Sequence, residues 1–133
     1  FLTLHPLKYA QLLEEKIKKF GTNVYLVNTG WNGGSYGIGE RISLPNTRAI
    51  IDAILDGSID NAETETLPVF NVQIPTSLNN VDSNILNPRN TWEDKENYDA
   101  TLNNLANQFK TNFEKFTDTP EGQNLAESAG PKF

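Results

Sequence analysis

The sequence has 133 residues, of which 37% are hydrophobic, so its size suits one domain with a core of its own. It contains no cysteine, carries a formal net charge of −6, and scatters its 11 basic residues apart from a small cluster at Lys16, Lys18 and Lys19. The missing cysteines exclude a disulfide framework. The acidic balance argues against a nucleic-acid partner, because phosphate groups repel negative charge.

The chain also contains no methionine. It therefore lacks an initiating residue, and we expect a processed or truncated product. No apolar run approaches the ~20 residues that a membrane-spanning helix needs. We expect a soluble, cytoplasmic protein without a membrane partner, and secretion has no support because small secreted domains usually depend on disulfides.

The first third of the chain predicts a helix, a strand and a loop, in that order. Pro6 suits a first helical position, and apolar residues at helical spacing predict a helix over residues 6–20 that ends at Gly21. Residues 23–27 are short, apolar and rich in β-formers, which predicts a buried strand. The glycine-dense stretch 30–39 predicts a loop.

The middle of the chain predicts a helix, a hairpin and a longer loop. Residues 45–55 carry an apolar stripe at helical spacing, closed by Gly57. Residues 62–74 alternate around a proline and predict two short strands or an edge hairpin. Residues 75–88 are rich in Asn, Ser and Pro and predict a loop with one helical turn near residues 82–86.

The last third predicts a long helix, at about residues 94–116, with an aromatic-rich face. That face consists of Tyr98, Leu102, Leu105, Phe109, Phe113 and Phe116. Pro120 predicts the start of a final short helix. The fold class is therefore mixed α/β. One buried strand needs sheet neighbours that this chain does not offer convincingly, so we expect an incomplete domain.

The glycine-rich loop follows a predicted strand and precedes a helix, which is where phosphate sites often occur. From Gly34 onward its glycine spacing matches a P-loop, but Glu40 and Arg41 stand where Lys and Ser or Thr are required. A dinucleotide fingerprint fails as well, because Ile42 occupies the third glycine position. A structural loop is thus favoured over an autonomous phosphate site, while a loop that contacts a nucleotide held elsewhere stays open.

Metal and nucleophile patterns are incomplete. Asp56 and Asp60 resemble the start of a calcium loop, but Asn61 and Leu67 replace the glycine and glutamate that such a loop needs, so a solvated helix exit is favoured. His5 is the single histidine and there is no cysteine, which excludes a zinc cluster or a Cys–His pair within the chain. We interpret His5 as a structural residue that caps the first helix, and we assign the chain no catalytic residue and no metal ligand.

Several segments nevertheless form an ordered set. They are Leu4-His5-Pro6 with Tyr9-Ala10, Tyr25 to Trp31 (YLVNTGW), Gly39 to Ser43 (GERIS), Thr47 to Ile50 (TRAI), Ile85 to Thr91 (ILNPRNT) and Ala129 to Lys132 (AGPK). With them, the chain resembles the C-terminal region of ATP-dependent phosphoenolpyruvate carboxykinases essentially from end to end. The resemblance implies that residues 1–133 are the C-terminal part of the mononucleotide-binding domain of such an enzyme.

The resemblance implies a gluconeogenic lyase that converts oxaloacetate and ATP to phosphoenolpyruvate, carbon dioxide and ADP. It would use magnesium with the nucleotide and manganese as a second metal. In this family the P-loop, the metal ligands and the oxaloacetate-binding arginines lie upstream of the matched region. The chain alone is therefore expected to be inactive, with the upstream part of the enzyme as its partner.

The same resemblance implies that Arg41, Ile42 and Thr47 form part of the adenosine pocket. A guanidinium can stack on or hydrogen-bond to a nucleoside, and isoleucine and threonine can supply apolar surface and a hydroxyl. The competing interpretation is structural, above all Thr47 as a helix-start residue. The loop Asn32–Ile38 is longer than in some relatives and Glu40 replaces their lysine, so the position of the loop over the nucleotide stays open.

Two other functions compete with this interpretation. A self-contained binding domain would use the glycine-rich loop and the aromatic helix to recognise a partner. A small nucleotide hydrolase is disfavoured by Glu40 and the missing P-loop lysine. Exposure of the stripe formed by Phe109, Phe113 and Phe116 distinguishes a self-contained domain from a fragment. A stripe covered by the chain itself favours a self-contained domain, whereas a bare apolar patch indicates a missing domain.

Overall fold

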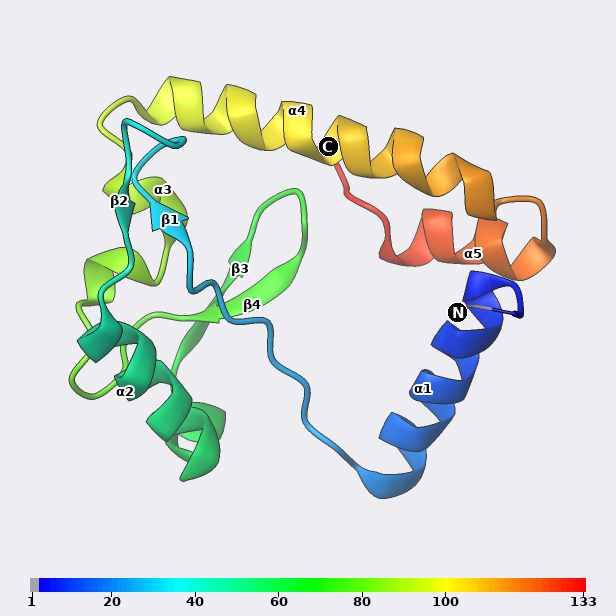
Figure 1. Ribbon diagram of the computed structural model, residues 1–133, viewed down its shortest axis with the longest axis horizontal. Helices are drawn as coiled ribbons and strands as arrows, with labels where there is room; N and C mark the ends of the chain where they lie inside the picture. The colour runs from blue at the N-terminus through cyan, green and yellow to red at the C-terminus, as the bar shows by residue number, and fades with distance from the viewer. Residues whose placement is uncertain (1–2) are drawn as a thin grey trace. The chain divides into compact units, whose positions relative to one another are not determined.

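Two units make up the chain, of which the computed structural model describes residues 3–133. The first unit contains the residues up to Val27 together with Asn107–Pro131. The second contains Asn28–Ala106 with Lys132–Phe133. Helices and two small antiparallel sheets build these units, so the mixed α/β class is confirmed (Figure 1). No helix within residues 3–133 is both long and apolar enough to cross a bilayer.

The first unit begins with helix α1 (Pro6–Phe20), whose predicted ends are confirmed. The His5 Nδ1 atom accepts a hydrogen bond from the Leu7 N–H, so the predicted cap is also confirmed. Gly21 ends the helix in the left-handed region with φ 61°, where a side chain would be strained. Local signals at both ends therefore fix this helix.

Helix α5 (Pro120–Ala129), which Pro120 predicted, approaches the rest of the first unit through a glycine. The Thr119 hydroxyl caps the helix by accepting from the N–H of Gly122. A Cβ on Gly122 would lie 1.7 Å from the Phe116 carbonyl oxygen and 3.1 Å from Cδ1 of buried Leu7. The packing of α5 against its neighbours thus requires that residue 122 be a glycine, which has no side chain.

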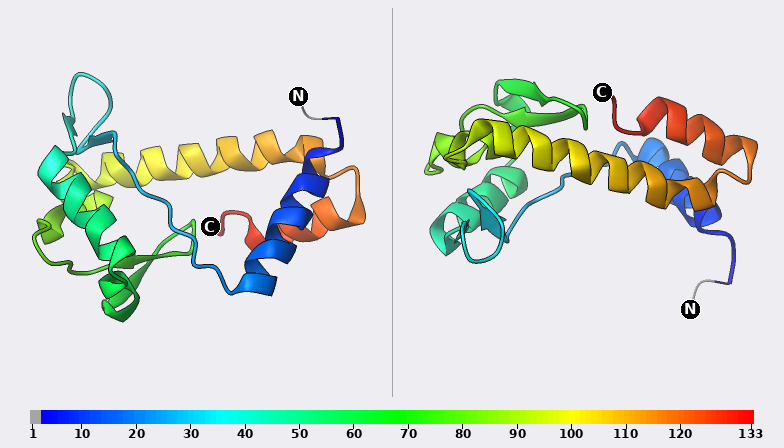
Figure 2. Two further views of the ribbon diagram at one scale, coloured as in Figure 1. Left: turned by 60° about the horizontal axis from the view of Figure 1, so that its bottom comes forward. Right: turned by 90° about the horizontal axis from the view of Figure 1, so that it is seen from above.

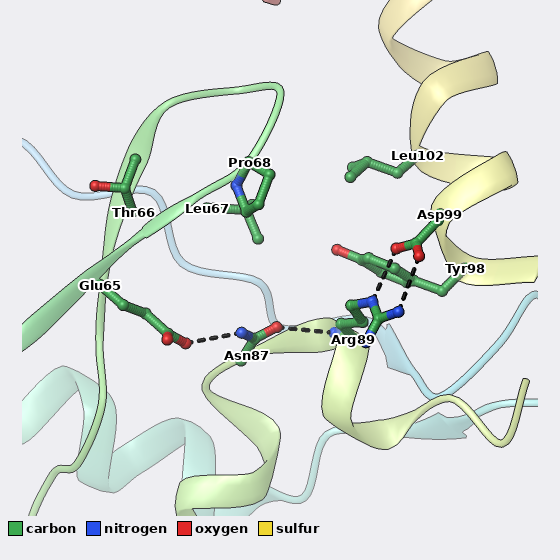
Figure 3. Close-up of a pocket in the computed structure, with 9 residues that line it drawn as sticks. All are labelled: Glu65, Thr66, Leu67, Pro68, Asn87, Arg89, Tyr98, Asp99 and Leu102. Carbon is green, nitrogen blue, oxygen red and sulfur yellow. Dashed lines mark hydrogen bonds and ion pairs between the residues drawn. The ribbon is translucent and has the colours of Figure 1, made fainter. Parts of the chain in front are cut away.

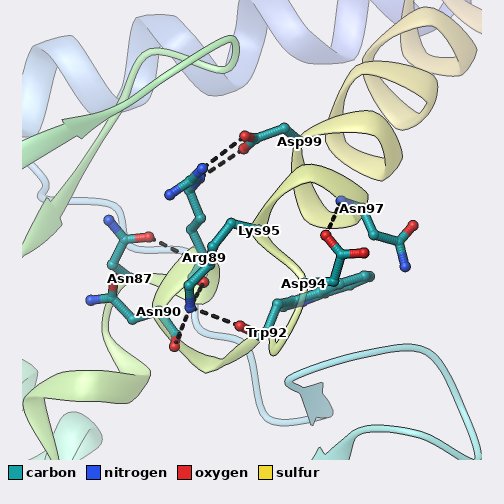
Figure 4. Close-up of polar contacts among 8 residues, drawn as sticks. All are labelled: Asn87, Arg89, Asn90, Trp92, Asp94, Lys95, Asn97 and Asp99. Carbon is teal, nitrogen blue, oxygen red and sulfur yellow. Dashed lines mark hydrogen bonds and ion pairs between the residues drawn. The ribbon is translucent and has the colours of Figure 1, made fainter.

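Helix α4 (Lys95–Phe113) carries Tyr98 and Ala106 as its buried residues and continues into the 3₁₀ turn η3 (Glu114–Phe116). Asp94, directly before the helix, caps it: the Asp94 carboxylate accepts a hydrogen bond from the Asn97 N–H at 2.9 Å (Figure 4). A side-chain oxygen before the first turn satisfies an amide that the helix leaves unpaired.

The second unit contains helix α2 (Leu44–Leu55) and the hairpin of β3 (Thr64–Leu67) with β4 (Val72–Pro75), in which Leu67 lies opposite Val72. The predicted helix and hairpin are confirmed. The predicted turn in the following loop is confirmed as the 3₁₀ helix η2 (Ser83–Ile85). A short helix α3 (Pro88–Thr91) precedes α4. The other elements among the described residues are η1 (Ser58–Asn61) and a short ladder of β1 (Trp31–Asn32) with β2 (Glu40–Arg41).

The predicted buried strand at residues 23–27 is wrong. This stretch belongs to no strand, and Figure 1 shows it as an irregular connection after α1. The only ladders among residues 3–133 join β1 with β2 and β3 with β4. Val24 is 65% and Leu26 is 94% exposed. A strand forms only where a second backbone completes its ladder, and sequence composition does not supply that neighbour.

Gly122→Ala should destabilise the chain by about 1–3 kcal/mol, because the added Cβ must displace backbone rather than a flexible side chain. The free energy of unfolding can be measured by urea denaturation followed by circular dichroism. Ser128→Ala, at an exposed position of the same helix, is the matched control and should change stability by less than about 0.5 kcal/mol. Equal stability of the Gly122 and Ser128 variants would contradict this packing.

Candidate functional site

The glycine-rich stretch forms a short hairpin whose two arms pair. Strand β1 (Trp31–Asn32) runs antiparallel to β2 (Glu40–Arg41), with Trp31 opposite Arg41 and Asn32 opposite Glu40. The left view of Figure 2 shows the intervening loop, in cyan, standing away from α2. The residue pattern predicts only a loop here, because each arm of two residues is too short to show the alternation of a strand.

The interior of this loop is a closed turn. The carbonyl oxygen of Ser35 accepts hydrogen bonds from the N–H groups of Ile38 and Gly39, at 3.0 and 2.9 Å. A Cβ on Gly39 would lie 2.5 Å from the Asn32 carbonyl oxygen and 2.6 Å from that of Gly34. Gly39 therefore has to be a glycine for the two arms to meet.

Asn28 and Ile42 hold the base of the hairpin. The Asn28 side chain accepts from the Gly30 N–H at 2.9 Å and donates to the Trp31 carbonyl at 3.2 Å. The Ile42 N–H donates to the Gly30 carbonyl at 2.9 Å, which closes the ladder on the side next to α2. These three bonds fix the backbone just before and just after the loop.

A second contact ties the hairpin to α3. The Thr91 hydroxyl donates to the Asn32 side-chain oxygen. A Cβ on Gly33 would lie 3.0 Å from the Thr91 carbonyl oxygen, so the loop backbone passes close to the end of α3.

Helix α2 starts immediately after the hairpin. The Ser43 hydroxyl accepts from the Asn46 N–H at 3.3 Å, and the Ser43 carbonyl accepts from the Thr47 N–H at 3.0 Å. Ser43 is therefore the cap, and the interpretation of Thr47 as the helix-start residue is wrong. Thr47 lies in the first turn, with its hydroxyl not needed for capping.

The three predicted site residues consequently gather around the start of α2. Arg41 is the last residue of β2 and exposed, Ile42 is half-buried directly before the cap, and Thr47 is half-buried one turn into the helix. A guanidinium, an apolar side chain and a hydroxyl thus come from one continuous segment. Glu40 is exposed next to Arg41.

A cavity of about 400 Å³ lies elsewhere in the second unit, between the β3–β4 hairpin, α3 and the start of α4 (Figure 3). Its lining residues are Glu65, Thr66, Leu67, Pro68, Asn87, Arg89, Tyr98, Asp99 and Leu102. None of the three predicted site residues contributes to this cavity. Cavity size therefore does not identify the predicted site.

The charged groups of this cavity satisfy one another. Arg89 donates two hydrogen bonds of 2.9 Å to the Asp99 carboxylate, and Asn87 donates to Glu65 at 2.7 Å. The bonds from Arg89 lower the pKa of the Asp99 carboxyl, and burial raises the pKa of the Tyr98 hydroxyl. An arginine held in a bidentate pair is not available to a ligand anion.

Lys95, close to the Arg89–Asp99 pair, stabilises the backbone at the end of α3. Its ammonium group donates to the carbonyl oxygens of Arg89, Asn90 and Trp92 at 2.7–2.9 Å (Figure 4). These are carbonyls at the end of α3, which has no following turn to use them. The connection from α3 to α4 is therefore closed by one side chain.

Asp56 and His5, which were considered as parts of metal or nucleophile sites, have local partners. The Asp56 carboxylate accepts from the Ser58 N–H at 2.8 Å, as at a solvated helix exit. The His5 Nε2 lies 3.4 Å from the Asp118 carboxylate, and its ring meets Phe116 edge-on. Within residues 3–133, no three His, Cys, Asp or Glu side chains are grouped so that they could hold a metal ion.

Comparison with known proteins identifies the family. The sequence model that describes "Phosphoenolpyruvate carboxykinase" in its ATP form matches residues 1–84, which is more than half of the chain. The chain belongs to the phosphoenolpyruvate carboxykinase family. This match includes the hairpin and all of α2.

Curated relatives extend the similarity to almost the whole chain. "Phosphoenolpyruvate carboxykinase (ATP)" of Campylobacter lari is 54% identical over 131 residues, which are 98% of this chain and 25% of the relative. The enzymes of the same name from Campylobacter jejuni subsp. doylei and Sulfurimonas denitrificans are each 53% identical over 132 residues. In both comparisons these residues are 99% of this chain and 25% of the relative. The chain thus spans about a quarter of the length of these carboxykinases.

Gly39→Ala should open the base of the hairpin, because its Cβ would collide with two backbone oxygens. We expect the Ile42 amide, which the Gly30 carbonyl protects, to exchange its hydrogen at least about tenfold faster, as follows from a loss of about 1.4 kcal/mol of local stability. Mass-spectrometric or NMR hydrogen exchange measures this rate. Ser35→Ala keeps the backbone bonds of the turn and is the control, and unchanged protection in the Gly39 variant would contradict the closed turn.

Proposed function

We propose that this chain supplies one wall of the adenosine pocket in an ATP-dependent phosphoenolpyruvate carboxykinase. That enzyme would convert oxaloacetate and ATP to phosphoenolpyruvate, carbon dioxide and ADP. One observation carries the proposal: in a member of this family, Arg41, Ile42 and Thr47 lie on the short segment that leads from β2 into the first turn of α2. They are the residues that the resemblance implied.

The three side chains suit a nucleoside. Arg41 is exposed, so its guanidinium can stack on a purine or donate hydrogen bonds to it. Ile42 is half-buried and offers a fixed apolar edge, because its N–H is bound to Gly30. Thr47 has a hydroxyl in the first turn of α2 while Ser43 caps that helix, which leaves the hydroxyl for a ligand.

The chemistry would come from the rest of the polypeptide. We assign the magnesium and manganese ligands, the phosphate-binding groups and the oxaloacetate-binding groups to the upstream part of the enzyme. The spacing from Gly34 to Arg41 lacks the lysine of a P-loop, which supports this division. The chain alone would then be inactive. Its acidic charge and missing cysteines support a cytoplasmic enzyme.

Exposed apolar surface supports an intramolecular partner. Leu44, Ile51 and Leu55 recur at steps of seven and four along α2, which places them in one stripe. They are 69%, 37% and 79% exposed, and Phe109 of the aromatic helix is 54% exposed. Such surface favours a segment covered by the other three quarters of the enzyme over a self-contained binding domain.

Arg41→Ala in the full-length enzyme should raise the KM for ATP about tenfold or more. A hydrogen bond from a charged group to a desolvated partner contributes about 1.5–3 kcal/mol, which corresponds to that change. The KM for oxaloacetate should stay within about twofold, because the lost contact is made by the nucleotide alone. Steady-state kinetics with each substrate varied in turn measures both constants.

Arg48→Ala is the matched control, since it removes the same charge from an exposed position on α2. We expect its KM for ATP to remain unchanged. If both arginine variants lose ATP affinity equally, the effect is one of net charge, and the assignment of Arg41 to the pocket is wrong. An unchanged KM for ATP in the Arg41 variant would refute it as well.

A further inference from the structure

The ladder of the hairpin pairs Trp31 with Arg41. The bond from the Ile42 N–H to the Gly30 carbonyl puts Gly30 and Ile42 at a hydrogen-bonding position of the ladder, although the Gly30 N–H itself donates to Asn28. Such positions alternate along an antiparallel ladder, so Trp31 and Arg41 form the adjoining pair without these bonds. In that type of pair the side chains share one face and their Cβ atoms lie closest together.

Trp31 keeps much of its ring accessible. The indole is 44% exposed, and Tyr36 meets it in a T-shaped contact with ring centroids 5.3 Å apart and planes at 83°. A contact of this kind covers at most one face of the indole. Tyr36 itself is 84% exposed, so the pair forms an aromatic platform on the hairpin.

An arginine side chain next to such a platform has fewer conformations available to it. A guanidinium is planar and weakly hydrated, and it packs favourably over the face of an indole. A free arginine side chain loses up to about 2 kcal/mol of rotamer entropy when a ligand orders it. An indole on the same face can restrict the side chain before the ligand arrives, which would lower the entropy cost of binding.

We infer that Trp31 is a positioning residue for purine-nucleotide binding, which acts by holding the Arg41 guanidinium over the aromatic platform. This inference rests on the proposed role of Arg41 and adds a residue outside the three assigned to the pocket. The hairpin would then increase nucleotide affinity through its aromatic platform rather than through its glycines.

The test is a double-mutant cycle in the full-length enzyme, with Trp31→Ala, Arg41→Ala and the double variant. Trp31→Ala should raise the KM for ATP about fivefold, in the range of a partly desolvated cation–π contact, with kcat and the KM for oxaloacetate within about twofold. The double variant should be no weaker than Arg41→Ala alone, because Trp31 acts through that arginine. Trp31→Phe should restore ATP affinity to within about twofold, since phenylalanine keeps an aromatic face. Trp92→Phe, the same change at the other tryptophan, is the control.

The outcomes separate the inference from the function beneath it. If Arg41→Ala weakens ATP binding and Trp31→Ala does not, the positioning role is wrong and the pocket stands. If the two changes add in the double variant, Trp31 does not act through Arg41, which also overturns the inference. A Trp31 variant that lowers kcat and weakens both substrates alike would indicate a purely structural role. If Arg41→Ala itself has no effect on ATP, the proposed function fails.

Discussion

The candidate site depends on the closure of one short hairpin. The bond from Ile42 to Gly30 ends the ladder, and Gly39 lets the two arms meet because a side chain there would strike the Asn32 carbonyl. This closure places Trp31 opposite Arg41 and delivers the chain to the Ser43 cap of α2. Without this closure, the backbone that carries Arg41 and Ile42 into α2 would not be fixed.

The hairpin does not have the construction of a P-loop, and the proposed function does not need it. A P-loop surrounds phosphates with backbone amides and a lysine. In this loop the amides of Ile38 and Gly39 are bound to Ser35, and Glu40 is exposed beside Arg41. The glycines shape a turn, and the proposed contact with the nucleoside comes from the residues that follow it.

Signals contained within a few residues could be predicted from the sequence. The ends of α1 follow from His5, Pro6 and Gly21, and the β3–β4 hairpin follows from alternation around a proline. Pairing that needs a second segment could not. Residues 23–27 have strand composition but no ladder, whereas Trp31 and Arg41 pair in arms of two residues that show no strand pattern. The cap of α2 was missed because Ser43 and Thr47 offer the same chemistry four residues apart, and only backbone geometry distinguishes them.

Photolabelling of the full-length carboxykinase with 8-azido-ATP would locate the part of the enzyme that contacts adenine, because the azide sits on the base itself. After irradiation and tryptic digestion, mass spectrometry locates the modified peptide. We expect labelling within residues 28–55 that an excess of ATP prevents. ATP-protected labelling that lies entirely outside these residues would show that another part of the enzyme holds the adenine, and that this segment does not form the pocket wall.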